Sequence, residues 1–164
     1  MRLTLVISSL NSGGAERVLS ILANAWAARG DQVTVVTTHD AGRAPDYDLD
    51  PNVQLVSVDP DRRGFRAQLG IVRGLRRHLV RNQPDVVVSF LNYTNVLVLF
   101  ATRGLGLPVI VSERLDPTVI KLGPTWSGLR RLTYRRADVV VAQTPTAARR
   151  FDALAPGRVR VIPN

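Results

Sequence analysis

Short apolar runs alternate with longer amphipathic segments from one end of the chain to the other. The apolar runs predict strands at Leu3–Ser9, Gln32–Thr38, Val53–Val58, Asp85–Phe90, Pro108–Ser112, Asp138–Gln143 and Arg158–Ile162. The segments between them predict helices at Gly14–Gly30, Gly64–Asn82, Tyr93–Leu105, Thr125–Ala137 and Thr144–Ala155. Unbroken apolar runs are typical of parallel strands that are covered on both faces. The alternation therefore predicts an α/β fold, a Rossmann-like three-layer domain with a mainly parallel sheet.

The organisation of the chain fits a single domain. Its 164 residues are an ordinary domain length, and only the acidic segment His39–Asn52, predicted to be a loop, interrupts the alternation. The absence of cysteine excludes a disulfide framework and a thiol nucleophile. No apolar run reaches the roughly 18–20 residues of a membrane span, and the first residues lack a secretory pattern. We therefore expect a cytoplasmic domain.

A glycine turn follows the first predicted strand. It consists of Gly13, Gly14, Glu16 and Arg17 at the start of the first predicted helix. Adjacent glycines let a ligand approach the backbone, and a helix N-terminus attracts anions, so a phosphate or diphosphate is the expected ligand. The spacing fits neither GxGxxG nor GxxxxGK. The alternative is a tight turn capped by Asn11 or Ser12, with Glu16 complementing the helix dipole.

Two more polar segments are expected at the same edge of the sheet. Ligands of open parallel sheets bind beyond the carboxyl ends of the strands, where the strand order reverses. If the first strand is central, this point lies between the first and fourth strands. The segment after the fourth strand is Leu91–Asn95, which offers amide, phenol and hydroxyl groups to a polyol, and the segment after the fifth is Ser112–Pro117.

Five segments, in order, resemble the amino-terminal domain of retaining, family-four GT-B glycosyltransferases. They are SSLNSGGAERVLSILANAWAARGDQVTVVT, DVVVSFLNYTNVL, VIVSERLDP, YRRADVVVAQTPTAA and the terminal VRVIPN. The resemblance covers essentially the whole chain. It is strongest to the group that works on polyprenyl-diphosphate-linked glycans, such as the N-acetylgalactosaminyltransferases of bacterial glycan assembly.

The resemblance implies that residues 1–164 are one half of a GT-B enzyme. In that family the amino-terminal domain mainly holds the acceptor, and a second Rossmann-like domain holds most of the nucleotide-sugar. Val161–Asn164 falls where the interdomain linker begins, so the donor-binding domain and its paired glutamates would lie outside this chain. The expected activity is hexosyl or N-acetylhexosaminyl transfer by the full-length protein, from a UDP-linked sugar, without cofactor or metal. The 164 residues alone are expected to be inactive.

The resemblance also assigns roles to residues. The glycine turn, Gly13, Gly14, Glu16 and Arg17, matches the family's loop near the donor diphosphate. Many members have a histidine after the fourth strand, where this chain has Phe90-Leu91-Asn92-Tyr93, so Asn92 or Tyr93 is the expected local substitute. A retaining front-face mechanism needs no protein base, so no residue here is predicted to be catalytic.

The segment after the fifth strand supplies the other candidate acceptor-binding residues, Glu113, Arg114 and Asp116. Their carboxylates are expected to bind acceptor hydroxyls, and the Arg114 guanidinium to bind a diphosphate through two parallel hydrogen bonds. The alternative for the first two is a loop ion pair between Glu113 and Arg114.

Arginine is unusually frequent, and part of it gathers on one predicted helix. The formal net charge is +9, and 21 of the 22 cationic residues are arginine. Four of these, Arg66, Arg73, Arg77 and Arg81, lie within about 80° of one another on a helical wheel. They face away from a predicted apolar stripe of Phe65, Leu69, Val72, Leu75 and Leu79, which Arg76 interrupts.

This arginine face predicts a membrane-binding surface. Like charges one turn apart repel each other, and anionic lipid head groups attract basic residues by about 1 kcal/mol each. We therefore expect a peripheral protein on the inner face of the membrane. The alternative is a solvated helix face in an arginine-biased composition.

Two other functions remain open from the sequence. A nucleic-acid-binding domain would explain the charge, but it calls for aromatics among the basic residues, and aromatics make up only 5% of the chain. A nicotinamide-dependent Rossmann enzyme would explain the fold and could use Asp40 as a ribose-binding acid, but the glycine spacing does not fit.

Overall fold

Strands and helices alternate along the part of the chain that the computed structural model describes, residues 1–39, 44–58, 64–114 and 122–163. The strands are β1 (Arg2–Ile7), β2 (Gln32–Thr37), β3 (Gln54–Ser57), β4 (Val86–Phe90), β5 (Val109–Glu113), β6 (Val139–Ala142) and β7 (Val159–Val161). The helices are α1 (Gly14–Ala28), α2 (Phe65–Asn82), α3 (Asn92–Ala101), α4 (Pro124–Thr133) and α5 (Pro145–Asp152), with the 3₁₀ turn η1 (Tyr134–Arg136) after α4.

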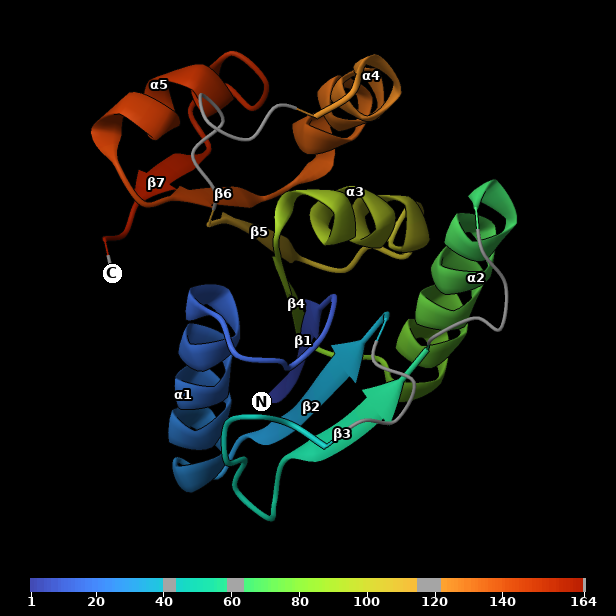
Figure 1. The fold of residues 1–164 in the computed structure, drawn as a ribbon, viewed down its shortest axis with the longest axis vertical. Coiled ribbons are helices and arrows are strands. Elements are labelled where there is room, and N and C mark those ends of the chain that lie inside the picture. Colours follow the sequence, from blue (N-terminus) through green and yellow to red (C-terminus); the bar gives the residue numbers. More distant parts are fainter. Residues whose placement is uncertain (40–43, 59–63, 115–121, 164) are drawn as a thin grey trace.

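The strands form one parallel sheet in the order β3-β2-β1-β4-β5-β6-β7 (Figure 1). This confirms the predicted Rossmann-like fold. Strand β1 lies in the middle, and the strand order reverses between β1 and β4, as expected. Residues 39 and 44–52 contain no helix or strand, which agrees with the predicted loop.

Helices cover both faces of the sheet unequally. Helix α1 packs on one face through a buried row that includes Leu19 and Ala23, while α2, α3 and α5 pack on the other (Figure 1). The strands supply both cores because alternate side chains point to opposite faces. In β1, for example, Leu5 packs against the α1 side and Val6 against the other side. The described residues therefore form three layers, and among them α1 is the one helix on the thinner side.

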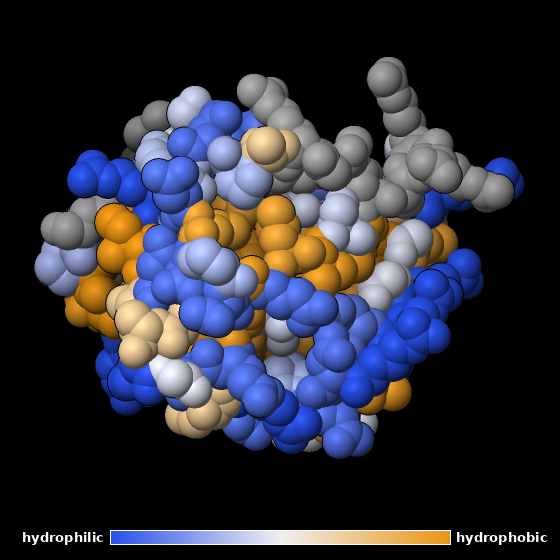
Figure 2. All heavy atoms as spheres, turned by 90° about the horizontal axis from the view of Figure 1, so that it is seen from below, coloured by the Kyte–Doolittle hydropathy of each residue, from blue (hydrophilic) through white to orange (hydrophobic). Residues whose placement is uncertain are grey.

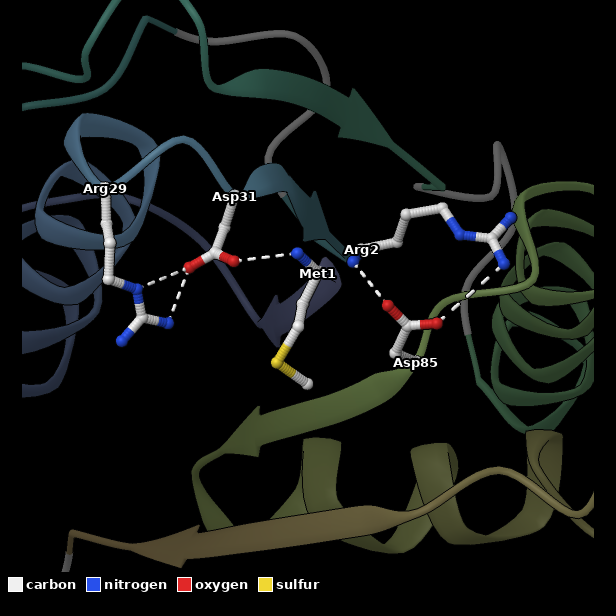
Figure 3. Close-up of polar contacts among 5 residues, drawn as sticks. All are labelled: Met1, Arg2, Arg29, Asp31 and Asp85. Atoms are coloured by element: carbon white, nitrogen blue, oxygen red, sulfur yellow. Dashed lines mark hydrogen bonds and ion pairs between the residues drawn. The ribbon is translucent and has the colours of Figure 1, made fainter.

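Ion pairs hold the chain at the amino-terminal edge of the sheet (Figure 3). The amino group of Met1 lies 2.8 Å from Asp31, which Arg29 also contacts, and the backbone N–H of Arg2 donates to Asp85 at 2.7 Å. The hydrogen bond from the amino terminus, helped by Arg29, lowers the pKa of Asp31. These contacts connect α1, β1, β2 and β4 at the edge opposite the ligand-binding edge that the sequence predicts.

The buried face of α2 differs from the predicted stripe. The buried residues are Ala67, Ile71, Leu75 and Leu79, whereas Leu69 is 41% exposed; the side chain of Phe65 lies outside the described residues. The shift has a steric cause. A Cβ on Gly74 would stand 3.2 Å from the Val58 Cβ, so glycine at this position lets α2 approach the end of β3.

Candidate functional site: the carboxyl edge of the central strands

The predicted polar segments meet where the central strands end. Register pairs Val6 of β1 with Ser89 of β4, and Phe90 of β4 with Ser112 of β5. The chain segments that follow β1, β4 and β5 therefore leave the sheet side by side, and the Leu91 N–H donates to the Ser112 carbonyl at 3.2 Å. This edge is the position at which open parallel sheets bind ligands.

The glycine turn starts α1 without a side-chain cap. Gly13 is the N-cap residue, in an extended conformation with φ −175°, and Gly14 is the first helical residue. The Glu16 carboxylate folds back onto Gly13 and occupies the space that a Cβ there would need. A Cβ at position 13 would require only that the flexible Glu16 side chain move aside. The alternative, a cap formed by Asn11 or Ser12, does not hold, whereas Glu16 supplies the negative charge at this helix end.

A second carboxylate lies beside this turn. The Ser12 N–H donates to Asp46 at 2.6 Å, and the Asp46 N–H donates to the Leu10 carbonyl at 2.9 Å. Arg17, in the first turn of α1, is exposed. An incoming diphosphate would therefore meet backbone N–H groups and Arg17, but also the negative charges of Glu16 and Asp46.

The segment after β4 enters a helix at once, one residue before the start that the sequence predicts. Helix α3 already begins at Asn92, which is 4% exposed and accepts a hydrogen bond from its neighbour's N–H at 2.8 Å. Tyr93 is 44% exposed, and its ring meets the Trp126 ring edge-on at a centroid distance of 4.8 Å. Of the two predicted substitutes for the family's histidine, Tyr93 is therefore the one that presents its side chain to solvent.

The turn that leads into α3 is strained. Leu91 adopts φ 74° and ψ 142°, a combination that only glycine enters at low cost. Two hydrogen bonds hold it there, because its N–H donates to the Ser112 carbonyl and its carbonyl accepts from the Asn95 N–H at 2.8 Å. Such strain clusters at binding sites and active sites in proteins, and here it lies at the point where the strand order reverses.

A buried polar network lies beneath this turn. The Ser89 hydroxyl donates to the Asn95 side-chain oxygen at 2.7 Å. The Asn95 amide in turn donates to the Ser112 carbonyl at 3.2 Å and reaches the Tyr134 hydroxyl at 3.3 Å. The Tyr134 hydroxyl donates to the Glu113 carboxylate. The network thus joins β4, β5, α3 and η1 directly behind the candidate site.

The expectation that Glu113 faces the cleft is wrong. Glu113 is the last residue of β5 and is 3% exposed, because its side chain points to the face that α3 and η1 cover. Burial raises the pKa of its carboxyl group, and the hydrogen bond from Tyr134 opposes that rise. Burial and the nearby Glu113 charge together raise the pKa of Tyr134 well above its usual value.

Arg114 points the other way. Its guanidinium carbon lies 5.4 Å from the centre of the Phe90 ring, on the α1 side of the sheet, and burial lowers its pKa. Because Glu113 and Arg114 point to opposite faces of the sheet, they do not form the loop ion pair that was the alternative interpretation of these two residues. Asp116, the last of the predicted acceptor-binding residues, lies outside the described residues, as does Asp40.

The four arginines predicted to bind a membrane do not belong to this edge. Arg66, Arg73, Arg77 and Arg81 are all exposed on α2, and the last three line a groove of about 590 Å³ between α2 and β3. Seen from below, hydrophilic residues gather on the side where α2 lies (Figure 2).

Arg76 is not an irregularity of this face. Its guanidinium donates to the Ala101 and Arg103 carbonyls at 3.0 and 2.8 Å and thereby caps the end of α3.

Sequence reasoning placed Asn95 in a ligand-binding segment and missed Tyr134, although both are fully buried. Asn95 was visible as a polar residue at the start of an otherwise apolar helix, since a buried amide requires hydrogen-bond partners. Tyr134 gave a weaker signal, because nothing local indicates which group its hydroxyl contacts. Trp126 was also missed, although its ring supports Tyr93.

The chain matches known proteins over nearly its whole length. Residues 13–164 match the family described as glycosyl transferase 4-like domain. A curated relative from Campylobacter jejuni is 33% identical over 145 residues, which are 85% of this chain and 39% of the relative. That relative is the GalNAc-alpha-(1->4)-GalNAc-alpha-(1->3)-diNAcBac-PP-undecaprenol alpha-1,4-N-acetyl-D-galactosaminyltransferase.

Solved structures share the fold at low sequence identity. Sucrose-phosphate synthase from Thermosynechococcus elongatus superposes with a TM-score of 0.78 at 16% identity, covering 99% of this chain and 48% of that one. The lipopolysaccharide outer core galactosyltransferase WaaB gives 0.77 at 14% identity, with 100% and 46% covered. HepE from Anabaena, solved with UDP, gives 0.72 at 18% identity, with 100% and 44% covered.

The chain therefore spans less than half the length of these proteins, and its Rossmann-like fold corresponds to one half of a GT-B fold. Together the matches favour the glycosyltransferase interpretation over the nucleic-acid and nicotinamide alternatives. Because the family match extends over residues 13–164, the chain belongs to the glycosyl transferase 4-like domain family.

Proposed function

We propose that this chain is the acceptor-binding half of a retaining glycosyltransferase, which moves a sugar from a nucleotide-sugar to a glycan or a lipid-linked acceptor. The observation that carries the proposal is the strained turn into α3, where the exposed Tyr93 stands at the reversal of strand order. A relative named for its action on an undecaprenyl-diphosphate-linked glycan supports an acceptor of that class.

The donor side of the reaction belongs to a second domain in this proposal. A UDP-linked hexose or N-acetylhexosamine is the proposed donor, held mainly by that domain, with no metal or other cofactor. The glycine turn at Gly13 and Gly14 would close over the donor diphosphate through backbone N–H groups, with Arg17 nearby. The 164 residues alone would bind an acceptor without transferring sugar.

The proposed role of Tyr93 in acceptor binding can be tested by removing its hydroxyl group. Tyr93→Phe keeps the ring against Trp126 but removes the phenol group, so we expect about fivefold to tenfold weaker binding of a polyprenyl-diphosphate-linked glycan, measured by calorimetry, from loss of one hydrogen bond. Thr34→Val is the matched control, because it removes a hydroxyl at the opposite edge of the sheet. Equal affinities for Tyr93→Phe and the unaltered chain would remove Tyr93 from the acceptor site.

We further propose that the chain docks peripherally on the inner face of the membrane through Arg66, Arg73, Arg77 and Arg81. No helix in the described part of the chain is both long and apolar enough to cross a bilayer. The ranges of α2, α3, α4 and η1 contain no Asp or Glu at all, so this side of the molecule presents unbalanced positive charge. Anionic lipid head groups are the partner that this charge suits.

Vesicle co-sedimentation tests the docking. Replacing Arg66, Arg73, Arg77 and Arg81 by Ala is expected to weaken binding to anionic vesicles at least tenfold, at about 1 kcal/mol per basic residue. The control variant replaces Arg17, Arg149, Arg150 and Arg160, which are exposed on other elements, and changes the net charge equally. Equal loss in the two variants would mean that overall charge, rather than the α2 face, drives the interaction.

A further inference from the structure

An apolar groove runs between α2, α3 and α4, next to the candidate site. Its volume is about 720 Å³, and Leu69, Val72, Leu97, Phe100, Trp126 and Leu129 contribute its apolar walls. Leu69 is 41% exposed, and Val72, Phe100, Trp126 and Leu129 are only half-buried. The groove therefore leaves side chains partly hydrated that an apolar occupant would cover.

The groove lies along helices whose amino-terminal ends are at the same edge of the sheet as the candidate site. All three helices follow strands of the parallel sheet, so their amino-terminal ends lie at the carboxyl edge of the sheet. Trp126 lines the groove and also supports the ring of Tyr93. On α3 the lining runs from Val96 to Phe100, about 6 Å along the helix axis, and Arg103 lines the groove just beyond the end of the helix. The groove thus lies next to Trp126, the ring that supports Tyr93, and extends along α3 away from the carboxyl edge of the sheet.

The charges around the groove specify what kind of molecule fits. Arg103 lines its end away from the candidate site, and Arg66, which does not line it, lies one turn before the lining residue Leu69, toward the carboxyl edge of the sheet. The ranges of the three helices that form it contain no Asp or Glu. An apolar groove with a cation near its mouth and no carboxylate on the three helices complements an amphiphile that has an anionic head and a hydrocarbon tail.

We infer that this groove binds the isoprenoid chain of the lipid-linked acceptor, beginning at the units nearest the diphosphate. The inference rests on the proposed function and adds a second binding site to it: the glycan lies at the carboxyl edge by Tyr93, and the first part of the lipid tail lies between α2, α3 and α4. A channel of this size accommodates a short stretch of one chain rather than the surface of a bilayer.

Soluble isoprenoid diphosphates test the groove without a membrane. Isopentenyl, geranyl and farnesyl diphosphates carry the same head and one, two and three isoprene units, and inorganic diphosphate carries none. Trp126 reports occupancy directly once Trp26, on α1, is replaced by Phe. We expect the dissociation constant to fall on the order of tenfold with each unit, because each adds buried apolar surface.

Two matched substitutions test whether the dependence of affinity on chain length arises in the groove. Leu69→Glu places a carboxylate in the groove, and Val80→Glu makes the same kind of change at a residue that is 52% exposed on the same helix but does not line the groove. Leu69→Glu is expected to abolish the dependence on chain length, while Val80→Glu retains it. Val72→Trp, which fills the groove, is expected to act like Leu69→Glu.

The outcomes separate this inference from the proposed function. Affinity that does not change from isopentenyl to farnesyl diphosphate, or equal losses for Leu69→Glu and Val80→Glu, would overturn the groove assignment alone. In that case a lipid-linked glycan would still bind through its glycan and diphosphate. If neither the isoprenoid diphosphates nor the lipid-linked glycan bound, both the groove assignment and the acceptor proposal would fail.

Discussion

Glu16 folds back over the first residues of α1 and places its carboxylate against Gly13. A negative charge there stabilises the helix by about 0.3–1 kcal/mol, but it also repels a diphosphate that approaches the same N–H groups. Glu16→Gln is therefore expected to change two quantities in opposite directions. The free energy of unfolding should fall by a few tenths of a kcal/mol, while diphosphate should bind about fivefold more tightly, from roughly 1 kcal/mol of relieved repulsion.

The two quantities are measured by urea denaturation and by diphosphate titration. Asp152→Asn, at the end of α5, removes one charge on another element and should leave diphosphate binding unchanged. Weaker binding by Glu16→Gln would contradict this account and would mean that the carboxylate contacts the ligand itself.

Glu113 makes stability depend on pH. Burial raises its pKa in the folded protein above the unfolded value, so the unfolded chain loses this proton first as the pH rises. The free energy of unfolding should therefore fall from about pH 4.3 up to the raised pKa, by at most about 1.4 kcal/mol per pH unit. Glu113→Gln cannot titrate and should lack this slope in urea denaturation series.

Tyr134→Phe provides the companion variant. It removes the hydrogen bond that holds the Glu113 pKa down, so the fall in stability should extend to higher pH than in the unaltered protein. Identical pH profiles for Glu113→Gln and the unaltered protein would show that Glu113 ionises equally in the folded and unfolded states.

The position of a residue could be predicted where the neighbouring sequence determines the local structure. The glycine turn lies at the predicted position, because a strand that is followed by Gly-Gly and a helix leaves few alternative positions for the turn. Glu113 and Asn95 could not be placed in the same way. Their positions depend on Tyr134, a partner far along the chain, and on which face of the sheet the last residue of β5 points to.

At the scale of elements, α2 shows where a helical wheel succeeds and fails. The four arginines are exposed as predicted, because charged side chains stay hydrated. The buried row nevertheless passes through Ala67 and Ile71, since Gly74 packs close to Val58 of β3. A wheel ranks side chains by polarity and gives no weight to a glycine that permits close helix–strand contact.

Arg76 connects α2 with α3 and yields a prediction about stability. Its guanidinium satisfies two carbonyls at the end of α3, where helices favour a positive charge. Arg76→Ala should lower the free energy of unfolding by about 1–2 kcal/mol in urea denaturation. Arg77→Ala, on the exposed arginine face, should be neutral or slightly stabilising because it relieves repulsion on that face. Equal effects would show that the α3 cap contributes nothing.

At the scale of the whole molecule, the parallel sheet follows from strand–helix alternation and right-handed crossovers, whereas its order, with β1 in the middle, had to be assumed. The strand order and the distribution of residue types give different parts of the surface different properties. Ion pairs of Asp31 and Asp85 hold the amino-terminal edge, the carboxyl edge carries the strained turn and Tyr93, and the layer of α2, α3 and α4 is basic with an apolar groove. The groove could not be predicted, because it depends on how three helices pack.

The central claim is that an acceptor binds at the carboxyl edge of β1, β4 and β5. Amide chemical-shift mapping with a polyprenyl-diphosphate-linked glycan tests it most directly. The account predicts shifts at the turn through Leu91, at Tyr93 and at the end of β5, and none around Asp31 and Asp85. Shifts confined to the amino-terminal edge, or no shifts at saturating ligand, would contradict it.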